Sequence, residues 1–175
     1  MLTSHRFSAL AGALLLTLLL AVASPGPAGA AGGGGGEGTT ASAKPEDPQY
    51  TAAVKAIKAN EYAKAIPLLQ GVVSRDDKNA DAYNWLAYAT RKTGDPAASL
   101  PLYQKALAID PKHKGAHEYI GEAYLMLDNL AKAKEHLTTL DKLCFITCGE
   151  YRDLKRAVEA YEKSGGKSKP TAASR

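Results

Sequence analysis

The chain has 175 residues, with 22 lysines and arginines against 18 aspartates and glutamates. The formal net charge of +4 comes from segments at the two ends, because residues 46–163 contain equal numbers of basic and acidic side chains. A nucleic-acid-binding domain normally concentrates positive charge on its folded part, so this charge distribution argues against a nucleic-acid partner.

Residues 1–30 are predicted to be a signal peptide rather than part of the fold. An apolar run, Ala9–Ala23, follows a weakly basic start and is broken by a Pro-Gly-Pro sequence. Small residues precede two cleavage positions, one after Ala30 and one after Ala23. The run is shorter than the roughly 20 apolar residues of a membrane-spanning helix. We therefore expect an exported protein, with the bacterial periplasm as its compartment and no stable membrane span after cleavage. Retention as an N-terminal anchor is the alternative.

Two segments that flank the predicted domain contain little that could be buried. Residues 31–45 include the glycine run Gly32–Gly36 and are predicted to be a flexible linker. Residues 164–175, SGGKSKPTAASR, are predicted to be a disordered basic tail. The remaining residues, 46–163, have the length of one domain.

The central stretch, residues 80–111, contains two runs of helical periodicity separated by Gly94-Asp95-Pro96. Glycine favours the end of the first helix, and aspartate is a good cap for the second. Proline suits the first position of that second helix, where its missing N–H group would have no partner. The stretch is therefore predicted to be a helix–turn–helix unit.

This unit resembles the tetratricopeptide repeat, whose period is about 34 residues. The same pattern recurs one period later, in residues 114–147, and one period earlier, in residues 46–79, where alanines weaken the first helix. The resemblance implies an all-α fold, a right-handed solenoid of about three helix–turn–helix repeats plus a C-terminal capping helix at residues 148–163. In the central repeat, residues 80–113, the matching positions are Tyr83, Leu86, Ala87, Thr90, Ser99, Tyr103, Ala106 and Pro111, of which Thr90 and Ser99 depart from the usual residues.

Cys144 and Cys148 are the only cysteines, and they lie on either side of the turn into the predicted capping helix. Thr147 and Glu150 have the spacing of a capping box, so Thr147 is expected to cap that helix. In an exported protein we favour a disulfide between the two cysteines. A thiol-redox or metal-handling factor is the alternative function, although the CxxxC spacing differs from the CxxC of thioredoxin-like proteins.

No combination of residues predicts catalysis. His113, His117 and His136 are expected at the surface or in helix packing, and no serine lies in a nucleophile motif. We therefore expect a non-enzymatic protein without a cofactor or a resident metal.

The resemblance also implies a binding surface, because the first helix of each repeat lines the concave face of such arrays. An aromatic strip flanked by charges of both signs is expected there, and Trp, Tyr and Arg dominate the binding energy at many interfaces. For Trp85 and Tyr88, packing between adjacent helices is the alternative. We therefore expect an adaptor or scaffold that binds a peptide or protein partner, with self-association as a further hypothesis. The candidate partner-binding residues are Tyr50, Asn84, Trp85, Tyr88, Arg91, Lys92, Glu118, Tyr119, Glu122, Arg152 and Arg156.

Chaperone-binding members of the family use a clamp of lysine, asparagine and arginine side chains to hold a carboxylate. The corresponding positions here are Tyr50, Val54, Trp85, Gly115 and Tyr119. The resemblance therefore does not imply capture of an acidic C-terminal tail.

Overall fold

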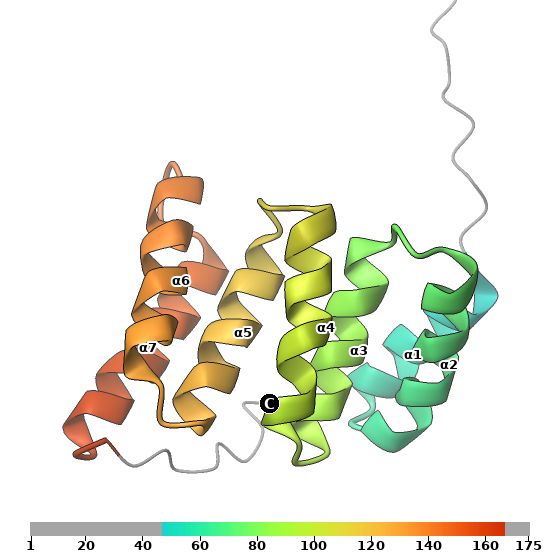
Figure 1. Cartoon of the computed structure of the whole chain (residues 1–175), viewed down its shortest axis with the longest axis horizontal. Coiled ribbons are helices and arrows are strands. Elements are labelled where there is room, and N and C mark those ends of the chain that lie inside the picture. Colours follow the sequence, from blue (N-terminus) through green and yellow to red (C-terminus); the bar gives the residue numbers. More distant parts are fainter. Residues whose placement is uncertain (1–46, 167–175) are drawn as a thin grey trace, which may run out of the picture. The chain divides into compact units, whose positions relative to one another are not determined.

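A computed structural model describes residues 47–166, which form seven α-helices and no strands (Figure 1). The predicted signal peptide, the linker and most of the basic tail lie outside these residues. No helix in the described range is long and apolar enough to cross a bilayer. The helices are α1 Pro48–Lys58, α2 Tyr62–Arg75, α3 Ala80–Lys92, α4 Pro96–Ile109, α5 Lys114–Met126, α6 Leu130–Leu143 and α7 Gly149–Lys163.

The helices form three consecutive pairs, α1–α2, α3–α4 and α5–α6, followed by the single helix α7. The second helices begin at Tyr62, Pro96 and Leu130, which reproduces the predicted period of about 34 residues. Each pair packs against the next, so the helices follow one another side by side in chain order (Figure 1). The predicted all-α repeat fold is therefore confirmed.

The turn inside each pair places one residue in the left-handed region of the backbone. These residues are Asn60, Gly94 and Asp128, with φ of 60°, 102° and 55°. They are separated by the repeat period, so all three turns use one geometry. Glycine adopts this conformation without steric cost, and asparagine and aspartate are the side chains that tolerate it best. The same turn is thus encoded by three different residues.

Side chains in the turns also cap the helices that follow. Asp47, Asn79, Asp95 and Asn129 each accept a hydrogen bond from a backbone N–H in the first turn of the next helix. His113 does the same for α5, through its Nδ1 atom. Each bond satisfies an N–H group that has no partner within its own helix.

The core consists of three clusters along the array, linked by partly buried side chains, because each pair buries apolar side chains against its neighbours. Leu69, Ile120, Leu140 and Leu154 are completely or almost completely buried. Burial of one such side chain contributes about 1.5–3 kcal/mol. Small residues let the helices approach closely: a Cβ atom added at Gly121 of α5 would lie 2.6 Å from Leu154 Cδ2 of α7. Helix α7 therefore covers the apolar side of the last pair.

The first helices of the pairs contact one another, whereas the second helices do not. Among the described elements, α1 contacts α3 and α3 contacts α5, but α2 does not contact α4, and α4 does not contact α6. An array in which only one row of helices is in contact is curved toward that row. The inner face is therefore formed by α1, α3 and α5.

The start of α7 differs from the prediction. The helix begins at Gly149, one residue later than expected, and Cys148 rather than Thr147 occupies the N-cap position. Cys148 has extended backbone angles, φ −85° and ψ 167°, so it is the last residue outside the helix. No side-chain capping bond forms there, and the predicted capping box is wrong. Glu150 still lies in the first turn, where a carboxylate favours the positive end of the helix dipole.

Candidate functional site

Three aromatic side chains from two inner helices form a cluster, which we call the aromatic cluster: Trp85 and Tyr88 of α3 and Tyr119 of α5. Trp85 and Tyr88 are one helical turn apart, and their ring centroids lie 5.6 Å apart in a T-shaped arrangement. Tyr119 lies 4.8 Å from Tyr88 and 6.3 Å from Trp85. All three rings are half-buried, so part of each remains accessible. Such ring pairs contribute about 0.5–1.5 kcal/mol beyond their burial.

Two cations from the last turn of α3 lie over these rings. The Arg91 guanidinium carbon is 5.4 Å from the Tyr88 centroid and 5.7 Å from that of Tyr119. The Lys92 ammonium is 5.7 Å from the Tyr88 centroid. All three distances are within the range of cation–π attraction. The chain's own cations therefore hold the rings in place from one side.

Arg91 is itself fixed from several sides and is only 4% exposed. Its guanidinium forms an ion pair with Glu122 of α5, at 2.7 Å, and its Nε donates to the Tyr103 hydroxyl of α4 at 3.4 Å. Removing one partner of a buried ion pair leaves an uncompensated charge, which is strongly destabilising. Arg91 therefore ties α3, α4 and α5 together and supports the aromatic cluster, and little of it is available to a partner.

Two further candidate residues are buried and lack partners. The side-chain oxygen of Asn84 is buried and accepts no hydrogen bond. Glu118 of α5 is 8% exposed. Desolvation raises the pKa of Glu118 to about 8, and repulsion from Glu122, Asp153 and Glu150 adds to the increase. Both are hydrogen-bond acceptors without a donor.

The remaining candidate residues are not part of the aromatic cluster. Tyr50 of α1 packs against the first core cluster. Arg152 and Arg156 of α7 are exposed, and Arg156 pairs with Asp153 on its own helix. The structure thus brings together the candidates on α3 and α5, and Tyr50 packs against the same core cluster as Trp85 and Tyr88.

Tyr62 belongs beside the aromatic cluster although the sequence analysis did not select it. Its ring lies 5.9 Å from that of Tyr88, and Lys92 lies 5.6 Å from its centroid. Its hydroxyl donates to Asn60 at 2.6 Å. Its position in the sequence could have indicated this. Tyr62 is the first residue of α2, next to the turn, and a long side chain at that position can reach the inner face.

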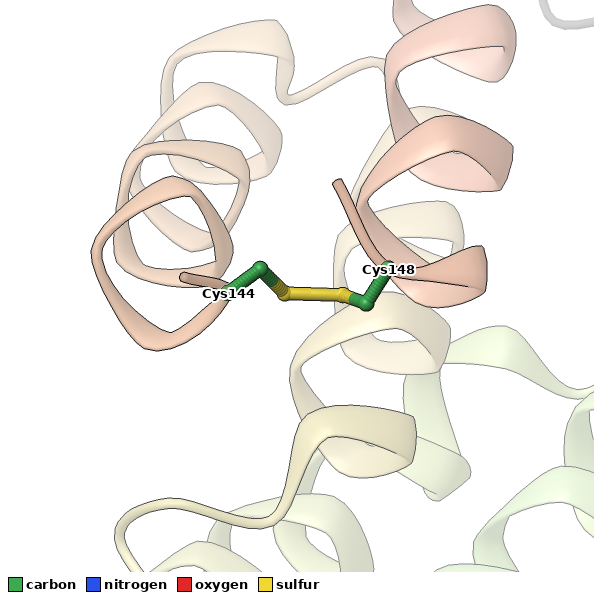
Figure 2. The surroundings of a disulfide bond; sticks show 2 residues. All are labelled: Cys144 and Cys148. Atoms are coloured by element: carbon green, nitrogen blue, oxygen red, sulfur yellow. A yellow bond between two sulfur atoms is a disulfide. The ribbon is translucent and has the colours of Figure 1, made fainter. Parts of the chain in front are cut away.

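Cys144 and Cys148 form a disulfide, with an Sγ–Sγ distance of 2.04 Å. Figure 2 shows the bond joining the end of α6 to the start of α7. Both cysteines are half-buried. Phe145 and Ile146 lie between them and are 102% and 80% exposed. The disulfide therefore closes a short loop whose two large apolar side chains contact little of the fold.

The histidines of the described residues all belong to the third pair, with His113 capping α5, His117 in α5 and His136 in α6. His117 is buried, with its Nδ1 atom 2.9 Å from Nδ1 of His136 and its Nε2 atom 3.0 Å from the carbonyl oxygen of Pro111. Burial, and to a smaller extent repulsion from His117, lowers the pKa of His136 to about 4. No group of three or more possible metal ligands gathers within the described residues.

An array of paired helices with accessible aromatic and charged residues on its inner row belongs to the class of helical-repeat proteins. Two sequence profiles of the tetratricopeptide repeat match the chain, one over residues 50–114 and the other over residues 91–143. The chain therefore belongs to the tetratricopeptide repeat family.

One curated relative is Protein FlbA of Caulobacter vibrioides, which is 41% identical over 61 residues. The match spans 35% of this chain and 10% of that protein, so it concerns a small part of the relative.

Solved structures share the fold at low identity. PcrH in complex with the chaperone binding region of PopD has a TM-score of 0.60 at 16% identity, over 67% of this chain and 90% of that chain. The Yersinia enterocolitica type III secretion chaperone SycD, with a peptide of the translocator YopD, has a TM-score of 0.57 at 18% identity, over 66% and 88%. The first repeat domain of Spaghetti (RPAP3), bound to the HSP90 peptide SRMEEVD, has a TM-score of 0.59 at 19% identity, over 66% and 90%. At such identities the likeness shows the fold alone.

Proposed function

We propose that this protein is a non-enzymatic interaction module that holds a peptide or protein partner on its inner face, and that it acts as an adaptor in an exported compartment. The observation that carries the proposal is the aromatic cluster on α3 and α5. Trp85, Tyr88 and Tyr119 are only half-buried, although they are large enough to be core residues. Rings that are rigid and partly accessible lose little conformational entropy on binding, which suits them to anchor a partner.

The similar structures support a peptide or protein as the partner. Three of them, PcrH, SycD and RPAP3, were solved with a segment of another protein bound. The family fold alone does not set the partner, because the binding chemistry depends on the residues of the inner face. The exported location rests on residues 1–30 of the sequence, which the structure does not describe.

The test is a cross-linked pull-down from an exported fraction with the full chain as bait. The binding variant carries Trp85→Ala and Tyr88→Ala on the inner row. The matched control carries Gln104→Ala and Lys105→Ala, at exposed positions of α4 on the outer row. Circular dichroism first establishes that both variants are as helical as the wild type.

The proposal predicts that a partner captured by the wild type and by the control is lost with the binding variant. Since both rings also pack against the core, a second variant, Lys92→Glu, changes the rim charge without removing a ring. It is expected to weaken the same capture. Partners that persist with the binding variant would place the interaction elsewhere and refute the assignment of the inner face. Cleavage of residues 1–30 from the mature protein, measured by intact mass, tests the export part separately.

A further inference from the structure

The carboxyl group of Glu118 is mostly covered by the fold, yet no other described residue donates a hydrogen bond to it or pairs with it. It is 8% exposed, and it forms no hydrogen bond or ion pair with any other described residue. Buried charged groups in folded proteins are normally paired or hydrogen-bonded, because their desolvation is otherwise costly. Unlike the side-chain oxygen of Asn84, the carboxyl oxygens of Glu118 are not fully enclosed, so a group of another molecule can reach them.

The charges around Glu118 make the position favourable for a cation. Glu122 of α5 and both Glu150 and Asp153 of α7 act on it electrostatically. Glu150 lies in the first turn of α7, and Asp153 is paired with Arg156 of the same helix. Arg91 of α3 is a positive group nearby, but its guanidinium is already paired with Glu122. Three carboxylates thus act on Glu118, and the internal cations nearby are already paired with two of them, Arg91 with Glu122 and Arg156 with Asp153.

Asn84 provides a second, independent indication of the same kind. It is 3% exposed, and its side-chain oxygen has no hydrogen-bond donor. Its amide nitrogen lies 3.5 Å from the position that a Cβ atom would take at Gly115, one helical turn before Glu118 on α5. Glu118 lies on α5 and Asn84 borders the first turn of that helix, and a side-chain oxygen of each has no donor among the described residues.

We propose that the partner presents a lysine or arginine side chain to this face, and that its cationic group docks on Glu118 between α5 and α7. This inference rests on the proposed function and specifies the chemistry of the partner. Lysine and arginine have only donors and a positive charge, so they supply what Glu118 and Asn84 lack. Acidic segments are repelled by the three carboxylates that act on Glu118. The family's carboxylate clamp, whose positions are occupied here by other residues, selects the opposite charge.

Selection of random 12-residue peptides displayed on phage against the full chain tests the proposal. With the wild type, the selected peptides are expected to share a lysine or arginine at one fixed position. With Glu118→Gln, that enrichment is expected to disappear. The matched control is Glu159→Gln, the same change at an exposed position of α7, and it should retain the enrichment. If the wild type selects peptides without a shared basic residue, the inference is wrong while the proposed function survives. If it selects no peptides, the proposed function fails as well.

The best selected peptide then provides a second measurement, by titration calorimetry at pH 7 in two buffers of different ionisation enthalpy. Glu118 is mostly protonated at this pH before binding, because its pKa is about 8. A docked cation favours the carboxylate, so binding should release close to one proton. Replacing the basic residue of the peptide by norleucine should weaken binding at least tenfold to the wild type and little to Glu118→Gln. Equal proton release by the wild type and the Gln variant would overturn the proposal, as would equal losses of affinity.

Discussion

The unpaired carboxyl group of Glu118 should lower the free energy of unfolding of the free protein at neutral pH, relative to a chain without an ionisable group at this position. Its pKa is raised from 4.5 to about 8 in the folded state. Below pH 4.5 both folded and unfolded chains carry the protonated group, and the shift has no effect. As the pH rises from 4.5 to 8, the unfolded chain loses this proton while the folded chain keeps it, so the free energy of unfolding falls. Above pH 8 the loss is complete.

The magnitude follows from the two pKa values. Between the pKa of the unfolded chain and that of the folded chain, each pH unit lowers the free energy of unfolding by about 1.36 kcal/mol. The substitution Glu118→Gln removes the ionisable group and keeps its shape. It should therefore raise the free energy of unfolding by about 3 kcal/mol at pH 7 and by less than about 1 kcal/mol at pH 5. A gain of stability on loss of a binding-site residue is a common trade-off between stability and function.

Urea unfolding, followed by the circular dichroism of the helices at pH 5, 6, 7 and 8, measures this difference. The difference between variant and wild type should grow with pH across this range. Glu159→Gln, on the exposed side of α7, should differ from the wild type by no more than about 0.5 kcal/mol throughout. If Glu118→Gln is equally or less stable than the wild type at pH 7, or if the difference does not depend on pH, the reasoning about its environment is wrong.

Three other measurements address stability elsewhere in the array. Because His136 is held neutral, with its pKa lowered from 6.5 to about 4, the unfolded chain binds a proton first as the pH falls below 6.5, and the fold loses stability. His136→Gln should therefore lose less stability than the wild type between pH 7 and 4.5 in urea titrations, and parallel losses would contradict this. Gly121→Ala places a Cβ atom 2.6 Å from Leu154, so it should lower the free energy of unfolding by about 1–3 kcal/mol, which a lower thermal midpoint would reveal. Replacing Cys144 and Cys148 by serine removes a short-loop cross-link and should cost about 2 kcal/mol, with helix content unchanged; an unaltered unfolding midpoint would show that the bond does not form.

The repeat pattern made most of the fold predictable, because each helix is bounded by local signals at a fixed spacing. Gly94-Asp95-Pro96 marked one turn, and Asp95 does cap α4. The turn at Asn60 carries no glycine, and it could be placed only by counting one period from the clear repeat. Thr147 was assigned a cap from its spacing to Glu150, and the assignment failed because the structure keeps Cys148 extended and outside the helix.

The sequence predicted which residues of the candidate site come together, but not how far each of them is buried. The family pattern selects inward positions, and Trp85, Tyr88 and Tyr119 do come together. The pattern does not say how deeply each side chain is covered, because that depends on neighbouring helices. Glu118 of α5 is influenced by carboxylates of α7, a helix that packs against α5 but is separated from it in the sequence by α6. Tyr62 was missed because the selection considered only first helices, whereas a tyrosine at the start of a second helix can reach the same rings.

The uneven contacts between the two rows of helices have a mechanical consequence. Bending the array changes the spacing of α2, α4 and α6 most, and these helices share no direct contacts that such a change could break. The distances between α1, α3 and α5 stay nearly constant, because these helices are in contact. The distances between α2, α4 and α6 increase or decrease as the array bends. Since each repeat is stabilised only by its neighbours, small rotations between repeats add up along the chain. The curvature of the inner face can therefore change while the contacts along α1, α3 and α5 and those within every helix pair are kept.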